Sequence, residues 1–168
     1  MKKRTAVIGA LVSLMPLGQP LMIGIGTALT NTAVMLTVPE KAKAESASFY
    51  YNRGIDKYDI GDYYGAISDY TKAIEINPNL HQAYYNRGWI KSSKLKDYYG
   101  AISDYTKALE INPSDADAYN NRGRAKYLLG DNKGACKDAK EAASLGDEES
   151  KRILSGPIGK KICGSSRN

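Results

Sequence analysis

The residues that could catalyse a reaction or bind a metal are few in this sequence. The 168-residue chain has one histidine, His81, and two cysteines, Cys136 and Cys163. These three residues cannot supply the four ligands of a structural zinc site, and a Ser-His-Asp or Cys-His enzyme would have to use His81 alone. His81 follows a proline-containing junction and is expected to be a solvated residue at the start of a helix. We therefore expect a protein that is not an enzyme, with no metal, no cofactor and no small-molecule substrate.

The two cysteines could instead have a structural role. Cys136 and Cys163 both lie near the C-terminal end of the chain. An even number of cysteines in an oxidising compartment permits a disulfide, which would tie the end of the chain to the preceding part. The alternatives are two free thiols, or a buried Cys136 that packs as a small apolar residue.

The positive charge of the chain is concentrated at its start. Lys and Arg number 24 and Asp and Glu 18, a net charge of +6 that alone would suggest a nucleic acid or an anionic membrane as partner. Residues 1–44 carry +4 of this excess, so the remainder carries only +2. An RNA-binding helical-repeat protein is the alternative function. Because phosphate binding requires a basic surface, we expect no nucleic-acid partner.

The first 44 residues have the pattern of an export signal. Residues 2–4 are Lys-Lys-Arg, residues 5–39 contain no charged side chain, and Ala42 and Ala44 form a small-x-small cleavage site. Cleavage is predicted after Ala44. The alternative is an uncleaved membrane anchor through residues 5–38, because about 20 apolar residues suffice to cross a bilayer. In either case the C-terminal part is expected to be exported, or tethered to the membrane.

The rest of the chain is an internal repeat. A five-residue block, Tyr50 to Gly54, recurs at residues 84–88 and, less closely, at residues 119–123. A longer block, residues 63–78, recurs at residues 98–113 with one substitution. Apolar and small residues in this longer block have the i, i+3/i+4, i+7 spacing of an amphipathic helix. The pattern predicts repeats of two antiparallel helices at residues 47–80, 81–115 and 116–149, and the one extra residue of the second repeat is placed in its interhelical turn.

This pattern resembles the tetratricopeptide repeat family, whose period is about 34 residues with aromatic, Gly, Ala and Pro residues at fixed offsets. The Tyr-Asn-Arg-Gly sequence of the repeats and the end of the third repeat also resemble repeat proteins common in cyanobacteria. For such a source, the site of export would be the periplasm or the thylakoid lumen. The resemblance implies an all-α, right-handed superhelical array of three helical hairpins over residues 45–155. Residues 147–155 are expected to form a short capping helix, and residues 156–168 a mobile tail.

The repeats depart from the family pattern at two positions. The family's Leu before the Gly is Arg53, Arg87 and Arg122 here, and the family's Tyr three residues after the Gly is Lys57, Lys91 and Lys126. Each arginine recurs with an aspartate in the second helix, namely Asp69, Asp104 and Asp138. We hypothesise a partly buried Arg–Asp pair in each repeat. The alternative is a solvated arginine.

The resemblance also implies a partner-binding groove along the first helices of the repeats. The groove positions that we assign to partner binding are Tyr51, Asn52, Ile55, Tyr58, Tyr85, Asn86, Trp89, Asn121, Arg124 and Tyr127. Tyr, Trp and Arg are common anchors of protein interfaces, and asparagine amides can bind a peptide backbone. We therefore expect a protein-protein interaction scaffold that binds a protein or peptide, and by analogy a role in the assembly of a complex.

Some members of that family grip the C-terminal carboxylate of a peptide with a basic clamp. Here Tyr51 and Ile55 stand where the clamp has Lys and Asn, and Asp117 replaces a further Lys, although Asn86 matches. We therefore do not predict a receptor for chaperone tails. Helix packing is the safer interpretation for other tyrosines, such as Tyr70 and Tyr105.

Overall fold

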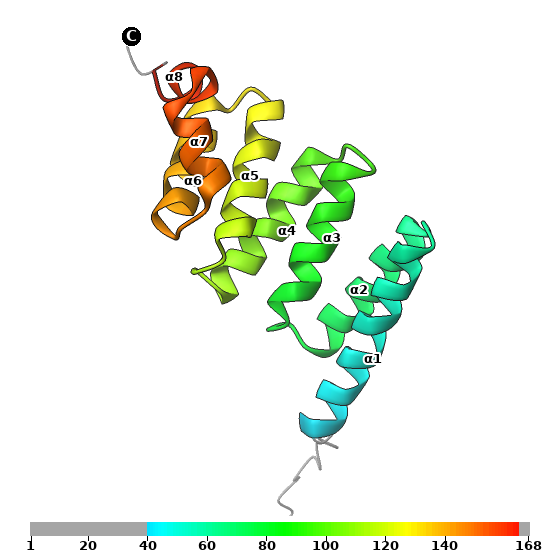
Figure 1. The fold of residues 1–168 in the computed structure, drawn as a ribbon. Helices are drawn as coiled ribbons and strands as arrows, with labels where there is room; N and C mark the ends of the chain where they lie inside the picture. Colours follow the sequence, from blue (N-terminus) through cyan, green and yellow to red (C-terminus); the bar gives the residue numbers. More distant parts are fainter. Residues whose placement is uncertain (1–39, 165–168) are drawn as a thin grey trace, which may run out of the picture. The chain divides into compact units, whose positions relative to one another are not determined.

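The computed structural model describes residues 40–164, and every regular element in this range is a helix. The helices are α1 (Glu40–Asp59), α2 (Tyr63–Ile76), α3 (His81–Ser93), α4 (Tyr98–Ile111), α5 (Ala116–Leu128), α6 (Asn132–Ser144), α7 (Glu148–Ser155) and α8 (Pro157–Gly164), shown in Figure 1. Helices α1 and α2, α3 and α4, and α5 and α6 pack as three consecutive pairs. The predicted all-α array of helical hairpins is confirmed.

Most of the predicted targeting segment lies outside the described residues. Only residues 40–44 of this segment are described, and they form the beginning of α1. Within residues 40–164, no helix has both the length and the apolar character that crossing a bilayer requires. The stretch on which the alternative of a membrane anchor rests, residues 5–38, lies outside the described range.

The second helix of each repeat begins with the same hydrogen bond. The Asp62 carboxylate accepts a hydrogen bond from the backbone N–H of Gly65 at 2.9 Å. Asp97 and Asp131 cap α4 and α6 in the same way, with Gly100 and Gly134 as donors. A capping aspartate satisfies a backbone N–H that has no partner inside the helix, and its negative charge suits the positive helix terminus. The repeated Asp-x-x-Gly sequence therefore fixes where each of these helices starts.

The turn between α3 and α4 contains the extra residue of the second repeat, as the sequence predicted. This turn has a left-handed residue at Lys96, whose φ is 59°. The corresponding turns of the first and third repeats have Gly61 and Gly130 there, with φ of 82° and 84°. A Cβ makes this backbone conformation unfavourable, so the second repeat retains strain that the other two avoid.

Replacing Lys96 by glycine is expected to raise the free energy of unfolding by about 0.5–1 kcal/mol, because the substitution relieves this strain. The measurement is urea unfolding followed by circular dichroism. Gly130→Ala is the converse control and is expected to lower the free energy of unfolding by a similar amount. Equal stability of the Lys96→Gly variant and the wild type would contradict this explanation of the turn.

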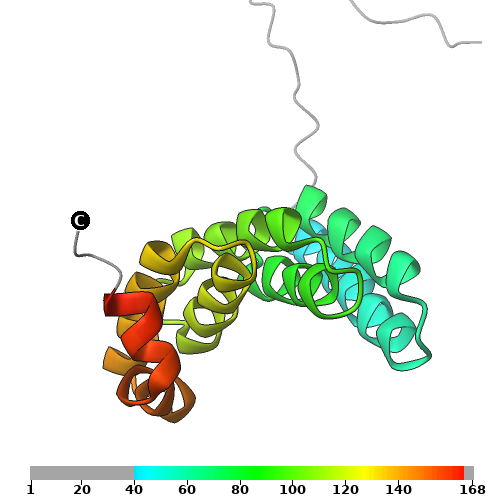
Figure 2. The same cartoon turned by 90° about the horizontal axis from the view of Figure 1, so that it is seen from above.

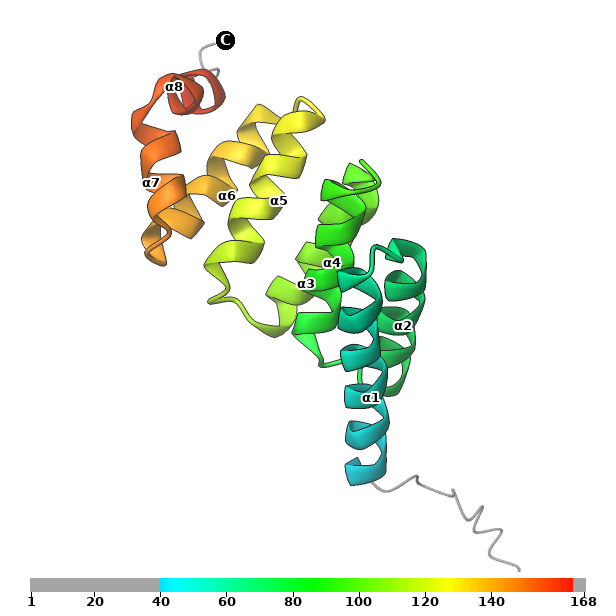
Figure 3. The ribbon, with the colours of Figure 1, turned by 45° about the vertical axis from the view of Figure 1, so that its right-hand side comes forward.

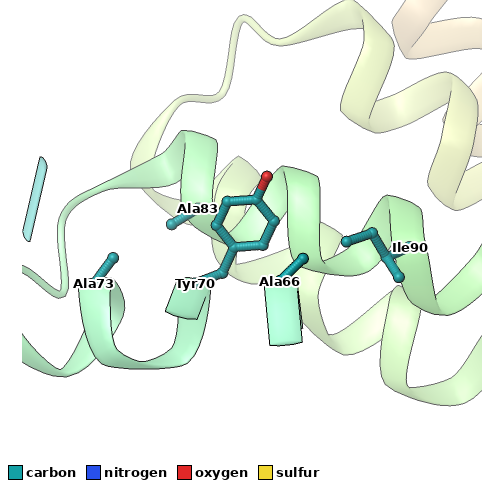
Figure 4. Packing of buried hydrophobic residues seen from close by; sticks show 5 residues of the cluster. All are labelled: Ala66, Tyr70, Ala73, Ala83 and Ile90. Atoms are coloured by element: carbon teal, nitrogen blue, oxygen red, sulfur yellow. The ribbon is translucent and has the colours of Figure 1, made fainter. Parts of the chain in front are cut away.

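Small residues and tyrosine rings form the core between the helices. Figure 4 shows the Tyr70 ring beside Ala66, Ala73, Ala83 and Ile90, and all five side chains are buried. A Cβ built on Gly54 would lie 2.7 Å from Cε1 of Tyr70, closer than atoms can approach without movement. Alanine and glycine therefore let two helix backbones approach while one aromatic ring fills the remaining space.

The three hairpins follow one another along a curved row within the described unit, with α1, α3 and α5 on its inner side (Figure 2). Helix α7 packs against α6, and α8 packs against both α6 and α7 (Figure 3). The capping helix expected at residues 147–155 corresponds to α7, which begins after the capping residue Asp147.

The structure differs from the sequence-based expectation after residue 155. Residues 156–168 were expected to form a mobile tail, whereas residues 157–164 form α8, and Ile162 is buried against Ala135 and Cys136 of α6. A disulfide joins Cys136 to Cys163, with the two Cα atoms 5.2 Å apart. The Gly- and Lys-rich composition of this segment did not indicate a helix, and the contacts of α8 with α6 and α7 are not visible in the sequence. Residues 165–168 lie outside the described range.

Removing this link through Cys163→Ser is expected to lower the free energy of unfolding by at most about 3.5 kcal/mol, the entropy of closing a loop between residues 27 positions apart. The loss is expected to fall mainly on α8, because the three hairpins do not depend on the disulfide. Limited proteolysis at Lys160 and Lys161 measures this local opening and should accelerate in the variant. Unchanged proteolysis at these two lysines would show that packing alone holds α8.

Candidate interaction groove

An ion pair lies between the two helices of each repeat, which confirms the Arg–Asp hypothesis. The Arg87 guanidinium contacts the Asp104 carboxylate at 2.6 Å and 3.0 Å through two nitrogens, the bidentate arrangement of a strong pair. The same contact joins Arg53 to Asp69, and Arg122 to Asp138. The three aspartates are buried.

Each buried aspartate also has a second cation that the sequence analysis did not assign. The Lys91 ammonium lies 2.8 Å from the Asp104 carboxylate, and Lys57 and Lys126 occupy the same place in the other repeats. Arg and Lys are four residues apart on the first helix and therefore lie on the same face. The two departures from the family pattern thus have one explanation, since both positions provide cations for one carboxylate. Their common i, i+4 spacing was the signal available in the sequence.

The same arginines connect neighbouring repeats. Arg87 donates a further hydrogen bond to Thr71 Oγ1 in α2 at 2.9 Å, and Arg122 donates one to Thr106 Oγ1 in α4 at 3.2 Å. Each of these guanidinium groups therefore holds the second helix of its own repeat and that of the preceding repeat. This connection fixes how the first helices are set beside one another along the inner side.

The ion pair of the first repeat makes stability depend on pH. Hydrogen bonds from Arg53 and then Lys57 lower the pKa of Asp69 from 3.8 to about 2, although burial opposes this shift. The folded-state pKa is below the unfolded-state value, so the pair stabilises the fold fully above about pH 4, and this stabilisation is lost as pH falls towards about 2.

As the pH falls through this interval, the free energy of unfolding is expected to fall by about 1–2 kcal/mol more in the wild type than in the Asp69→Asn variant. This difference is smaller than the pKa shift alone would give, because Arg53 is partly exposed to solvent. The measurement is urea unfolding at several values between about pH 5 and about pH 2. Glu110→Gln, at an exposed carboxylate of α4, serves as the control. Parallel pH profiles for the wild type and Asp69→Asn would contradict the assigned role of Asp69.

The inner side of the first two repeats contains a hollow of about 390 Å³. Five of the predicted groove residues line it, namely Ile55, Tyr58, Tyr85, Asn86 and Trp89. Asp59, Tyr70 and Ile90 complete the lining. Burial raises the pKa of Tyr70 and of Tyr85 to about 12, so both phenols are protonated and neutral near pH 7. The hollow thus has aromatic walls, with Asp59 as its carboxylate.

A second hollow, of about 490 Å³, lies between the third repeat and the C-terminal helices. Asn121, Arg124 and Tyr127 contribute to its lining, as three further predicted groove residues. Ala135 and Ala139 of α6 also line it, and the remaining wall comes from α7 and α8, including Arg152, Ile153, Pro157, Ile158 and Ile162. Sequence reasoning missed this part of the lining because it depends on where α8 is held.

Two predicted asparagine ligands already have partners within the protein. Asn86 Nδ2 donates to the Tyr51 hydroxyl at 3.1 Å, and Asn121 Nδ2 donates to the Tyr85 hydroxyl at 3.0 Å. Each bond joins one repeat to the preceding one, so these amides also hold the array together. Tyr51 lines neither hollow, and its ring packs beside Tyr70. Asn52 is exposed and also lines neither hollow.

The described residues contain no cluster of His, Cys, Asp and Glu that could hold a metal ion. His81 is the first residue of α3, at the junction of two repeats. The two hollows combine aromatic side chains with a few polar groups, and concave surfaces of this kind are suited to recognition.

Comparison with known proteins identifies the class to which this arrangement belongs. Models of the tetratricopeptide repeat match residues 47–80 and 69–102, and a TPR repeat model matches residues 94–130. The chain belongs to the tetratricopeptide repeat family. A comparison with curated protein sequences found no match.

Several solved TPR domains have similar structures. The first TPR of Spaghetti (RPAP3), bound to the HSP90 peptide SRMEEVD, is 27% identical with a TM-score of 0.64, and the match covers 74% of this chain and 96% of that domain. The Arabidopsis OM64 TPR domain is 26% identical with a TM-score of 0.64, over 73% and 98% of the two chains. The second TPR domain of human RPAP3, in complex with the HSP70 peptide SGPTIEEVD, is 27% identical with a TM-score of 0.61, over 74% and 98%.

Proposed function

We propose that this protein is a non-enzymatic scaffold that binds a peptide or a protein partner along its inner groove. The observation that carries the proposal is the hollow on the first two repeats, in which Tyr58, Tyr85 and Trp89 form aromatic walls. Aromatic side chains in a concave, partly apolar site are the usual anchors of protein recognition. The similar TPR domains that bind HSP90 and HSP70 peptides support peptide binding by this chain.

The chemistry of the groove favours a partner other than an acidic chaperone tail. The peptides bound to the similar domains end in Glu-Glu-Val-Asp. In the hollow of the first two repeats, Asp59 provides a negative charge, and no Lys or Arg among the described residues lines it. An acidic peptide would meet repulsion there, whereas a neutral or basic segment would be complementary. In this hollow the charge balance likewise gives no support to RNA as the ligand, because phosphate binding requires cations.

The proposal includes export, or attachment to a membrane, through the N-terminal segment. The Lys-Lys-Arg start, the uncharged stretch and the Ala42-x-Ala44 site support it. The disulfide between Cys136 and Cys163 adds support, because structural disulfides persist in oxidising compartments. N-terminal sequencing of the protein recovered from fractionated cells tests this part, with Glu45 as the expected first residue after cleavage.

Crosslinking and pull-down from fractionated cells test the binding proposal when wild type and variants are compared. Asp59→Arg and Arg124→Glu reverse exposed charges in the two hollows and are expected to abolish capture of the specific partner. The matched control is Tyr99→Ala, which removes an exposed ring of α4 that lines neither hollow. A partner that is captured equally by all these variants would contradict binding in the groove.

A further inference from the structure

Three aromatic rings surround one ammonium group beside the groove. The Lys94 Nζ lies 5.3 Å from the ring centroids of Tyr63 and Trp89, and 5.8 Å from that of Tyr58. The Tyr58 ring is 5.3 Å from that of Trp89 at an angle of 77°, and 5.8 Å from that of Tyr63 at 47°. Such inclined ring faces at this distance attract a cation through their negative faces.

The rings come from three different helices, so the fold holds them in place independently of Lys94. Tyr58 is in α1, Tyr63 begins α2 and Trp89 is in α3. Lys94, in contrast, is exposed and belongs to the turn after α3. Lys94 is the first residue after α3, and its side chain extends over the rings.

The ammonium of Lys94 can leave the rings at little cost. Among the described residues Lys94 makes no ion pair, whereas Lys57, Lys91 and Lys126 each pair with a buried aspartate. A lysine side chain that moves away from the rings enters water with its charge still solvated. The rings would then be free for another cation of the same kind.

The position of the rings connects them to the groove. Tyr58 and Trp89 also line the hollow on the first two repeats, together with Asp59. A segment bound in that hollow could therefore place a side chain against the rings, and the carboxylate of Asp59 favours a positive charge nearby. Aromatic walls with a neighbouring carboxylate are complementary to a lysine side chain.

We propose that Tyr58, Tyr63 and Trp89 form a binding site for the alkylammonium group of a lysine in the partner, and that Lys94 occupies this site in the free protein. The inference rests on the proposed function, because it assigns a chemical feature to the partner that the groove binds. Binding then requires exchange of one ammonium for another, so a partner that lacks a lysine at this point gains nothing from the rings.

The fluorescence of Trp89 reports directly on the site, because it is the single tryptophan of the chain. The probe is n-butylammonium chloride, which matches the lysine side chain, with n-butanol as the neutral analogue and sodium chloride at equal ionic strength. The Lys94→Met variant removes the ammonium group from the rings and keeps an apolar side chain of similar length. Lys137→Met, at an exposed lysine of α6, is the matched control.

Lys94→Met is expected to bind n-butylammonium about five-fold or more tightly than the wild type and Lys137→Met do. The additional change Tyr63→Leu is expected to abolish that gain, with circular dichroism confirming that the variant folds. Equal affinity of Lys94→Met and wild type, an equal response to n-butanol, or full affinity without the Tyr63 ring would each overturn the proposal. These outcomes are independent of the partner pull-down, which can fail or succeed separately.

Discussion

Replacing Asp104 by alanine is expected to lower the free energy of unfolding by about 3 kcal/mol, since breaking a buried ion pair leaves charge without a partner. The Asp104 side chain is 4% exposed and lies 2.6 Å from Arg87 and 2.8 Å from Lys91. Without the carboxylate the two cations remain close to each other, and their side chains are only 16% and 21% exposed. Chemical unfolding measured by circular dichroism gives the loss directly.

The control for this substitution is Glu110→Ala in the same helix. Glu110 pairs with Lys107 at the surface, and both side chains are more than half exposed, so its loss is expected to cost less than about 0.5 kcal/mol. A double-mutant cycle between Arg87→Ala and Asp104→Ala isolates the pair from the bond between Arg87 and Thr71, with an expected coupling of at least about 1.5 kcal/mol. Absence of coupling would show that Asp104 acts through packing alone.

The ion pairs illustrate how much of the structure could be predicted from the sequence. Arg and Asp recur in step with the repeat, and this periodicity was sufficient to predict the pair inside each hairpin. The hydrogen bonds of Arg87 and Arg122 to Thr71 and Thr106 were not predicted, because they cross from one hairpin to the next. The repeat period shows which residues occupy equivalent positions in each hairpin. It does not show which side chains of neighbouring hairpins come into contact, because this depends on how the helices pack.

The same limit applies to the groove. The repeat positions correctly brought Tyr58, Tyr85 and Trp89 to one hollow, because residues on one face of successive first helices must line the same surface. The amides of Asn86 and Asn121 were assigned to a ligand, but each donates to a tyrosine of the preceding repeat. An asparagine beside a groove and an asparagine between repeats have the same sequence pattern, so the structure was needed to tell them apart.

The residues that depend on irregular segments were the least predictable. Lys94 is the first residue after α3, where the other two described repeats have Ile60 and Leu129, so the repeat period did not indicate its contact with three aromatic rings. Helix α8 forms one wall of the hollow at the third repeat and is joined to α6 through Cys163. The sequence left this disulfide as one of several alternatives, and the wall of the hollow could not be assigned without it.

Replacing Tyr105 by alanine is expected to lower the free energy of unfolding by about 3–5 kcal/mol, because the loss of a large buried side chain leaves a cavity. Tyr105 is fully buried in α4, and its hydroxyl lies 3.2 Å from Ser92 Oγ. Burial of the phenol raises the pKa of Tyr105, so the hydroxyl stays neutral near pH 7. The cavity lies between α3 and α4, and the alanines and glycines around it cannot fill it.

Tyr99→Ala is the matched control, because Tyr99 lies in the same helix with 76% of its surface exposed, and its loss is expected to cost less than about 0.5 kcal/mol. Tyr105→Phe keeps the ring and is expected to cost about 1 kcal/mol through the lost hydroxyl contact.

The Tyr105 ring lies 5.8 Å from that of Tyr85, which lines the groove. Tyr105→Ala should therefore weaken partner capture even where the protein remains folded, whereas capture by Tyr105→Phe should equal that of the wild type. Equal losses of capture in both variants would show that the hydroxyl, and not the ring behind Tyr85, supports the groove.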